Sequence, residues 1–185
     1  FNEFKQKHFL QNESYHDPLT KIYNRRYMER YVEMNLDSSD SCAMFLIDID
    51  NFKTANDKFG HEKGDEVLCK ISEILRSNFR KTDCVARIGG DEFVILMPHI
   101  TDKSHVVNKA KTVLKEFPMI LHDEEFKNEI EISLSMGIIF TKSGENIEYE
   151  ELYRRADSFM YKAKKSGKGH AVIEWKGGKE MVISA

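Results

Sequence analysis

The chain has 185 residues, of which 41% are hydrophobic and 32% are charged, and this fits a single globular domain with a core of its own. The formal net charge of −3 excludes a general electrostatic attraction to nucleic acid or to an anionic membrane surface. Any phosphate group must therefore be bound by local lysines and metal ions, and we expect no nucleic acid among the partners.

The three cysteines, Cys42, Cys69 and Cys84, are scattered and form no CxxC pair, so we expect reduced thiols in a cytoplasmic domain. No apolar run approaches the length of a membrane span, and no signal peptide is visible. Because the chain begins at Phe1 rather than at Met, we expect it to be part of a longer protein with an upstream sensor. Attachment of that longer protein to a membrane is compatible with the sequence.

The boundaries of the domain follow from the apolar pattern. Residues 1–15 are expected to form a linker or helical stalk, with a frayed terminus as the alternative. Residues 16–175 are expected to form the folded domain and residues 176–185 a loose tail. A turn at 17–20 precedes a helix whose first turn Asn24 can cap.

Further apolar patterns predict the remaining elements in chain order. They are a strand at 43–47, a short helix at 52–56, a break at Gly60, a helix at 67–75, strands at 84–88 and 93–97, a helix at 106–117, a strand at 130–138, a helix at 152–163 and a strand at 171–173. The strand at 43–47 is apolar throughout, which predicts burial on both faces, whereas strict alternation at 130–138 predicts a half-buried strand. These elements predict an α/β fold, an α+β sandwich in which helices flank a central mixed five-stranded sheet.

The most informative stretch is 87–93, where two glycines and two adjacent carboxylates separate two predicted strands. Gly89 and Gly90 suit a tight hairpin, because glycine adopts positive φ without strain, and they let a bulky anion approach the backbone. Asp91 and Glu92 lie at the tip of this hairpin, where they cannot belong to the core. We interpret them as ligands, for which a hard cation is the natural partner.

A third carboxylate, Asp48, directly follows the strand at 43–47. A hairpin lying beside that strand would bring Asp48, Asp91 and Glu92 together at one end of the sheet. Three carboxylates so close would repel one another without a counter-ion. A pair of Mg²⁺ ions would remove this repulsion and supply the chemistry of displacement at a phosphate. The alternative is that these acids are solvated loop residues.

The stretch at 89–93 resembles the GGDEF signature of diguanylate cyclases. Other segments at matching spacing are similar to further motifs of this family, namely 17–20 with 24–26, 48–53, 56–65, 156–157, 161–164 and 167–168. The resemblance covers roughly residues 17–173. It implies a GGDEF or nucleotidyl-cyclase palm-like fold with a βααββαβ core.

The resemblance also implies a reaction. Members of the family condense two GTP molecules into cyclic di-GMP and release two pyrophosphates, and each domain binds one GTP, so that a homodimer is needed for catalysis. Mg²⁺ is the implied cofactor, with Mn²⁺ as a possible substitute. The implied partners are GTP, cyclic di-GMP as product and inhibitor, a second copy of the domain and an upstream sensor.

The resemblance assigns the metal and the proton transfer to residues near the signature. Asp48, the carbonyl of Ile49 and Asp91 would hold Mg²⁺, a set of hard oxygen ligands. Glu92 would either complete a second metal site or take the proton from the attacking 3′-hydroxyl, and Asp91 is the rival base. Lys53 would neutralise charge on the β- and γ-phosphates and in the transition state.

Two further groups of residues are implied to bind the triphosphate. Backbone amides near Asn51 and Phe52 would assist, as at a helix N-terminus. Lys164 and Lys168 are four residues apart, one above the other if the helix persists, and would grip the triphosphate; complementing a helix C-terminus is the alternative for both. The family usually has arginine where this chain has Lys168, which keeps the charge but loses the bidentate fork.

Asn56 and Asp65 are implied to read guanine, because an aspartate accepts from N1–H and N2–H₂ together and adenine lacks this pair of donors. A turn-forming or capping role is the alternative for both. His61 is either a further substrate contact or a solvated loop histidine. Gly89 and Gly90 would lie against the substrate.

Arg80 and Asp83 resemble the RxxD product-inhibition site of the family, in which Arg80 pairs with phosphate and stacks on guanine while Asp83 accepts from a guanine edge. A charged turn that closes a helix is the alternative. Two other functions remain open for the chain: a module that binds GTP or cyclic di-GMP without turnover, and an adenylate-type nucleotidyl cyclase. Asp65 argues against the second.

Overall fold

The computed structural model describes residues 15–36, 41–120, 129–141, 145, 147–174 and 179–185. The predicted stalk at 1–15 therefore lies, except for Tyr15, outside the described residues. None of the described helices has both the length and the apolar character that crossing a membrane requires.

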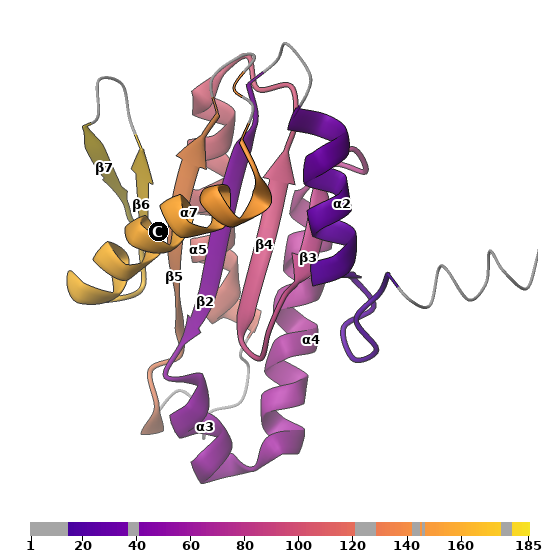
Figure 1. The fold of residues 1–185 in the computed structure, drawn as a ribbon. Helices are drawn as coiled ribbons and strands as arrows, with labels where there is room; N and C mark the ends of the chain where they lie inside the picture. The colour runs from indigo at the N-terminus through magenta and orange to yellow at the C-terminus, as the bar shows by residue number, and fades with distance from the viewer. Residues whose placement is uncertain (1–14, 37–40, 121–128, 142–144, 146, 175–178) are drawn as a thin grey trace, which may run out of the picture.

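Helices cover both faces of one sheet of seven strands (Figure 1). The helices are α2 (Arg25–Leu36), α3 (Phe52–Phe59), α4 (His61–Asn78), α5 (Lys103–Ile120) and α7 (Tyr149–Lys165). The strands are β1 (Tyr23–Asn24), β2 (Ala43–Asp50), β3 (Cys84–Arg87), β4 (Glu92–Met97), β5 (Ser133–Phe140), β6 (Ala171–Glu174) and β7 (Glu180–Ile183). Their order across the sheet is β1-β3-β4-β2-β5-β6-β7, with parallel pairing at β1–β3 and β5–β6 and antiparallel pairing elsewhere.

The five predicted strands form the middle of the sheet, but the predicted strand count was too low. The additional strands are the two edges, β1 and β7. β1 has only two residues, too few for a periodic signal. β7 lies within the segment that we expected to be a loose tail, and of its four residues only Ile183 is buried. Short edge strands of this kind carry little apolar pattern and are missed for that reason.

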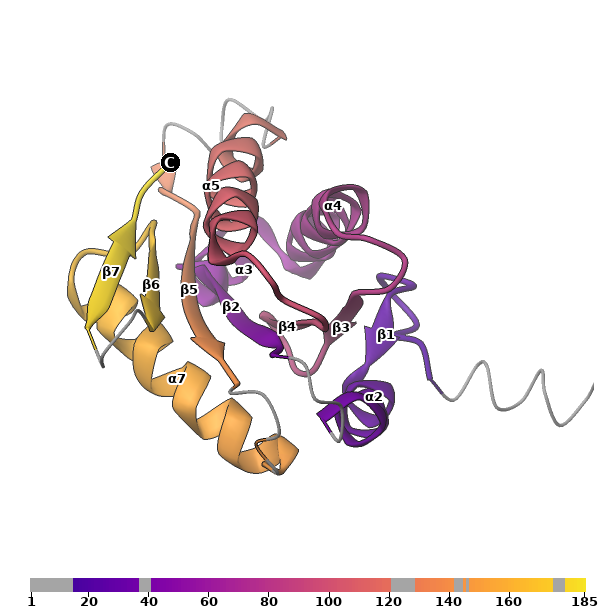
Figure 2. The ribbon, with the colours of Figure 1, turned by 90° about the horizontal axis from the view of Figure 1, so that it is seen from above.

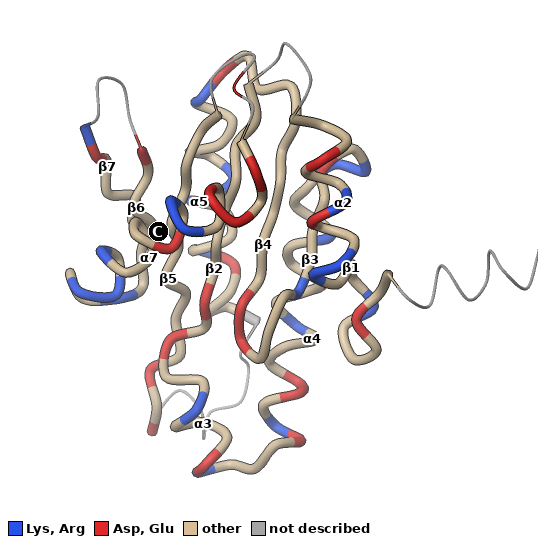
Figure 3. Tube along the Cα trace, in the orientation of Figure 1, with Lys and Arg blue, Asp and Glu red and all other residues tan. Residues whose placement is uncertain are grey.

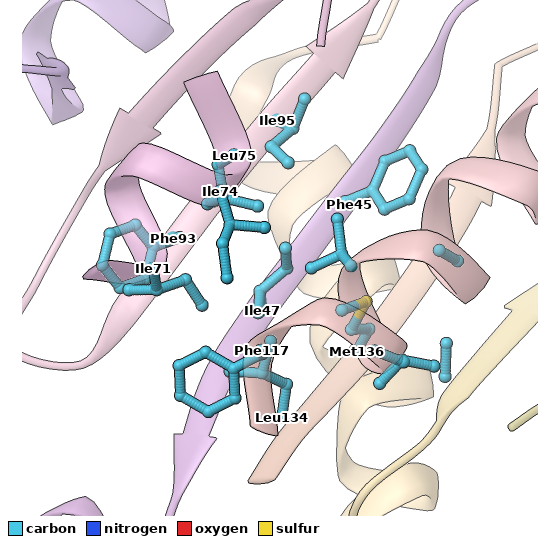
Figure 4. Packing of buried hydrophobic residues seen from close by; sticks show 14 of the residues in the cluster. Phe45, Ile47, Ile71, Ile74, Leu75, Phe93, Ile95, Phe117, Leu134 and Met136 are labelled. Carbon is cyan, nitrogen blue, oxygen red and sulfur yellow. The ribbon is translucent and has the colours of Figure 1, made fainter. Parts of the chain in front are cut away.

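The two layers of helices are separated by the sheet, with α4 and α5 on one side and α2 and α7 on the other (Figure 2). β2 lies in the middle and is buried on both faces, as predicted. Its residues Phe45 and Ile47 join the core beneath α4 and α5 (Figure 4). Ile49 belongs to the same cluster. Met44 and Leu46 point to the other side, into the core beneath α2 and α7.

The strand predicted at 130–138 is present as β5, but the predictions of its start and of its half-buried character were wrong. β5 begins at Ser133, and seven of its eight residues are buried, because α7 packs across its second face. Gly137 makes this approach possible, since a Cβ at that position would lie 2.0 Å from the carbonyl oxygen of Ala156. The alternation of apolar and other residues indicated one exposed face, but in β5 the small and polar residues of that face pack against α7.

Two predicted helix boundaries are confirmed. The side chain of Asn24 accepts a hydrogen bond from the backbone N–H of Tyr27 at 3.2 Å and so caps α2. Gly60 separates α3 from α4 with a φ of +87°, a conformation that favours glycine.

Candidate active site

Strand pairing brings the acidic residues together at one end of the sheet. β2 and β4 are antiparallel, and their register places Asp48 opposite Glu92. One residue further, the N–H of Ile49 donates to the carbonyl oxygen of Asp91 at 3.3 Å. Acidic segments at the end of β2 and the start of β4 accordingly lie side by side (Figure 3). The predicted proximity of Asp48 to Asp91 and Glu92 is confirmed.

Asp48 is a buried acid at this end of the sheet. Burial raises its pKa to about 6, and the neighbouring charge of Asp91 acts in the same direction. The ammonium group of Lys164 opposes this rise, because its Nζ lies 2.8 Å from Oδ2 of Asp48. The site therefore favours a cation at Asp48, and Lys164 supplies one.

The signature loop, residues 88–91, is held in place by Arg87, the last residue of β3. The guanidinium of Arg87 donates to the carbonyl oxygen of Gly90, from Nε at 3.0 Å and from Nη2 at 2.8 Å. Nη1 of the same residue donates to Oδ1 of Asp17 at 3.2 Å. The N–H of Ile88 closes the loop by donating to the carbonyl oxygen of Glu92 at 3.0 Å.

Of the two reasons expected for the glycines, the need for a positive φ was wrong, because neither Gly89 nor Gly90 has one. Space is what they provide. A Cβ at Gly90 would meet no atom within 4 Å, and one at Gly89 would meet only Oε2 of Glu92 at 3.4 Å. Both glycines are exposed, so their backbone remains accessible to a ligand.

Glu92 is held by α7. The hydroxyl of Tyr153 donates to both of its carboxylate oxygens, at 3.3 and 3.4 Å. Burial, together with the charge of Glu92, raises the pKa of Tyr153 to about 12, so this hydroxyl remains a donor at neutral pH. The contact fixes the side chain that is the candidate second metal ligand or base.

The oxygen atoms at this end of the sheet are candidate ligands for a metal ion. Within the described part of the chain, no three His, Cys, Asp or Glu side chains gather as a ready-made metal site. Asp48, Asp91 and the carbonyl of Ile49 nevertheless provide hard oxygen donors at one place, and Mg²⁺ commonly takes one or two carboxylates and completes its shell with water and phosphate oxygens. The residues fit Mg²⁺ bound together with a nucleotide better than Mg²⁺ alone.

The exit of β2 forms the next part of the site. Asn51 adopts a left-handed conformation with a φ of 62°, and its amide donates to the carbonyl oxygen of Glu131 at 2.7 Å. Its Oδ1 accepts a hydrogen bond from Nζ of Lys168 at 2.9 Å. α3 then begins at Phe52, which is buried, and carries Lys53 exposed to solvent.

The candidate guanine-reading residues lie on α3 and α4, which pack against each other. Oδ1 of Asn56 is buried and has no hydrogen-bond partner among the described residues. Gly64 of α4 leaves room for this amide, since a Cβ there would lie 1.8 Å from Oδ1 of Asn56. His61 and Asp65 are exposed on α4. An unpaired buried amide oxygen is costly in the folded protein and is typical of a group that awaits a donor.

The two candidate phosphate-binding lysines do not share a helix. α7 ends at Lys165, so Lys164 lies in its last turn and Lys168 lies in the loop that follows. The helix does not persist to Lys168, so the condition under which one lysine would lie above the other is not met. Both nevertheless reach the end of β2, Lys164 at Asp48 and Lys168 at Asn51.

Arg80 and Asp83 lie elsewhere, before β3, whereas the signature loop follows β3. The two residues form a reciprocal turn: the N–H of Arg80 donates to Oδ2 of Asp83 at 2.8 Å, and the N–H of Asp83 donates to the carbonyl oxygen of Arg80 at 2.9 Å. They line a cavity of about 460 Å³ to which Lys21, Arg76 and Lys81 also contribute. This wall is strongly cationic.

Sequence reasoning missed several residues that organise the site. They are Asp17, Asp50, Arg87, Ser133, Ser135 and Tyr153. Asp50 could have been noticed, because it follows Asp48 by two residues and so lies on the same face of β2. The other contacts join residues far apart in the sequence, and no local pattern reveals them.

Comparisons with known proteins agree with this arrangement. The family model described as "Diguanylate cyclase, GGDEF domain" matches residues 14–170. The chain is 37% identical over 163 residues to the response regulator PleD of Caulobacter vibrioides, covering 84% of the chain and 35% of PleD. It is 33% identical over 167 residues to the diguanylate cyclase DgcM of Escherichia coli K12, covering 88% of the chain and 39% of DgcM.

The fold is also that of a solved structure. The coiled coil and GGDEF domain of DgcB from Caulobacter crescentus, in complex with c-di-GMP, superposes with a TM-score of 0.77 at 24% identity and 90% coverage of both chains. The chain spans between 26% and 39% of the length of the curated relatives that it matches. From the extent of the family match, the signature loop and the shared fold, we conclude that this chain belongs to the GGDEF domain family of diguanylate cyclases.

Proposed function

We propose that the chain condenses two GTP molecules into cyclic di-GMP and releases two pyrophosphates. The observation that carries this proposal is the pairing of β2 with β4, which sets Asp48 beside Asp91 and Glu92 at the edge that Lys164 and Lys168 also reach. The family match and the similarity to a protein named diguanylate cyclase support it.

The proposed cofactor is Mg²⁺, which Mn²⁺ can replace. Asp48, Asp91 and the carbonyl of Ile49 would hold it, with Glu92 as a further ligand. When bound, the metal neutralises phosphate charge and polarises the reacting phosphate. Burial raises the pKa of Asp48, and a cation beside this carboxylate would favour its ionised form.

The nucleotide would be bound by groups around the end of β2. Lys53, Lys164 and Lys168 bind the triphosphate, and the amides of Asn51 and Phe52 assist at the start of α3.

The guanine base would lie between α3 and α4. The buried Oδ1 of Asn56 accepts from it, Asp65 accepts from its N1–H and N2–H₂, and His61 flanks it. Adenine does not offer these donors, so GTP is the proposed substrate.

The chemistry is a nucleotidyl transfer carried out twice. The 3′-hydroxyl oxygen of one GTP forms a bond to the α-phosphorus of the other, the bond from that phosphorus to the bridging oxygen breaks, and pyrophosphate leaves. The proton of the hydroxyl passes to Asp91 or Glu92. Each domain binds one GTP, so two copies must face each other, and their association sets the effective concentration of the reacting groups.

Regulation is proposed at two levels. The relatives are longer than this chain, and we propose that a sensor region controls dimerisation of a cytoplasmic domain. We further propose that cyclic di-GMP inhibits by binding at Arg80 and Asp83. These residues share a cationic cavity with Lys21, Arg76 and Lys81, which fits a ligand that has two negatively charged phosphodiester groups.

The proposal is tested by incubating the purified domain with GTP and Mg²⁺ and detecting the product by mass, over a wide range of protein concentration. We expect cyclic di-GMP, with an initial rate per domain that rises with concentration. If no product forms even when the domains are fused to a dimerising coiled coil, the proposed diguanylate cyclase activity is refuted. Tight GTP binding without turnover would then assign a nucleotide receptor, and equal turnover of ATP would assign a less selective cyclase.

A further inference from the structure

Asp50 is an acidic residue that the proposed chemistry leaves without a role. It is 2% exposed and lies two residues beyond Asp48 on the same face of β2. Its carboxylate accepts three hydrogen bonds from uncharged donors. Oδ1 accepts from the hydroxyl of Ser135 at 2.7 Å, and Oδ2 accepts from the hydroxyl of Ser133 at 2.7 Å and from the N–H of Gly169 at 3.1 Å.

The third of these donors belongs to an unusual loop. Residues 167, 168 and 169 all have positive φ, with values of 125°, 63° and 67°. Lys168 is the only one of the three that is not glycine, and a left-handed conformation is unfavourable for it. Strained residues of this kind persist where the surrounding structure holds them, and they gather at functional sites.

The backbone of Lys168 is fixed on both sides. Its N–H donates to the carbonyl oxygen of Ala163 at 3.1 Å, and its carbonyl oxygen accepts from Nδ1 of the buried His170 at 2.7 Å. Nε2 of His170 lies 2.7 Å from the hydroxyl of Ser166. With Gly169 tied to Asp50, the whole turn from 166 to 170 is anchored to the end of α7 and to β2.

The side chain that emerges from this turn points to the candidate triphosphate site. Nζ of Lys168 lies 2.9 Å from Oδ1 of Asn51, the residue next to Asp50. Asn51 is itself in a left-handed conformation and is tied to Glu131. Asp50 and Asn51 thus hold the same lysine, one through the backbone of its neighbour and the other through its ammonium group.

We propose that Asp50 is a positioning residue that fixes the loop 166–170 so that Lys168 presents its ammonium group to the triphosphate. The proposal rests on the GTP-binding function proposed above. Asp50 itself contacts neither metal nor nucleotide. Its role is to accept from Gly169 N–H, and an amide side chain can fulfil it: the oxygen of asparagine can accept from Gly169 and Ser133 while its NH₂ donates to the hydroxyl of Ser135.

The experiment is a double-mutant cycle on GTP kinetics with Asp50→Ala, Lys168→Ala and the double variant. Each single change should raise KM for GTP about tenfold with kcat changed less than about twofold, because a charge-assisted contact to the bound substrate is lost. The double variant should be no worse than Lys168→Ala alone. Asp50→Asn should retain a KM close to that of the unmodified chain. Glu73→Gln, an exposed acid-to-amide change on α4, is the control and should leave KM unchanged.

The proposal would be overturned if the increases in KM of the two single variants multiplied in the double variant. It would also be overturned if Asp50→Asn raised KM as much as Asp50→Ala does. If Asp50→Ala does not fold, Asp50→Ser takes its place, since serine keeps a polar group beside Ser133 and Ser135 but its shorter side chain falls short of Gly169 N–H. An Asp50→Ser variant with an unchanged KM would then count against the proposal.

The proposed function is tested separately, by measuring GTP binding and turnover with the unmodified chain. If that chain binds GTP without turnover, the same cycle is measured as Kd, and the inference stands or falls alone. If it does not bind GTP at all, both the proposed function and the inference are refuted.

Discussion

Lys164 and Asp48 form an ion pair across the site, with 2.8 Å between Nζ and Oδ2. Asp48 belongs to the central strand and Lys164 to the last turn of α7, so the contact links the sheet to the helix that covers it. A divalent cation at Asp48 must compete with this ammonium group. A nucleotide offers Lys164 another anionic partner, so binding of metal and of triphosphate should assist each other.

We predict that Lys164→Met separates these two effects. Without the competing ammonium group, Mg²⁺ alone should bind about five- to tenfold more tightly, whereas KM for GTP should rise about tenfold because a phosphate contact is lost. Metal titration by calorimetry without nucleotide, together with steady-state kinetics, measures both. Opposite shifts are the distinctive result. A loss of Mg²⁺ affinity in this variant would show that Lys164 supports the metal rather than competing with it.

Asp91→Asn should abolish synthesis and leave the fold intact. Turnover should fall about 10²–10³-fold or more, because a ligand of the proposed Mg²⁺ would be weakened where negative charge would develop during the reaction. The thermal midpoint without metal should not decrease, since the change removes a charge that lies close to Asp48. Glu33→Gln, an exposed change on α2, is the control. Turnover near that of the control would remove Asp91 from the metal site.

Two glycine substitutions should have contrasting results. Gly64→Ala places a methyl group 1.8 Å from the present position of Oδ1 of Asn56, so the amide must move and KM for GTP should rise severalfold. Gly90→Ala meets no atom within 4 Å and has no positive φ to strain, so the free energy of unfolding should change by less than about 0.5 kcal/mol. Urea denaturation and GTP kinetics on both variants make the comparison. An unchanged KM in Gly64→Ala would show that the position of Asn56 does not matter.

Asp17→Asn should give a pH-dependent loss of stability. Burial alone would raise the pKa of Asp17, but hydrogen bonds from Thr20 and the charge of Arg87 outweigh it and lower the pKa. A lowered pKa in the folded state means that the ionised form stabilises the protein above a pH of about 4, and that this contribution is lost as the pH falls through the folded value. We expect a loss of about 1 kcal/mol at pH 7, after allowing for solvent screening, from the hydrogen bonds.

Urea denaturation of Asp17→Asn and of the unmodified chain at pH 7 and at pH 3 measures this difference. The gap between the two proteins should narrow at the lower pH. A gap that widens on acidification would mean that Asp17 is not stabilised by its charge.

Arg80→Ala should relieve product inhibition without lowering the initial rate. The guanidinium is exposed beside a cationic cavity at the far end of β3 from the signature loop, so it can contact the product without touching the reacting groups. Rates measured with added cyclic di-GMP should fall much less than in the unmodified chain. Lys103→Ala, on α5, serves as a charge-matched control. Unchanged inhibition in Arg80→Ala would mean that this turn has only a structural role.

The sequence was a good guide where one local pattern decides the structure. The apolar run before Asp48 predicted a central strand, and the hairpin at Gly89 predicted that Asp91 would meet Asp48. It was a poor guide where partners come from far along the chain. β5 alternates as an exposed strand does, but Gly137 and its neighbours accept α7 on the second face.

The same limit explains the lysines. The spacing of Lys164 and Lys168 would place them on one helix face if the helix persisted, but α7 ends between them and Lys168 contacts Asn51 from the loop. Asp50 holds that loop by accepting a hydrogen bond from the N–H of Gly169, which is 119 residues away in the sequence. No local sequence pattern predicts a contact over such a separation. The assigned roles in metal and nucleotide binding remain predictions until the variants are measured.

The alternation of β2 has a consequence for how this site arises during folding. Phe45, Ile47 and Ile49 face one hydrophobic layer, and Asp48 and Asp50 continue the opposite face. A slip of one residue in pairing would turn both acids toward α4 and α5, among aromatic and aliphatic side chains with no counter-ion. A misregistered sheet would thus have a much higher free energy than the native one. The same acids that would serve the reaction therefore also favour the correct register of β2.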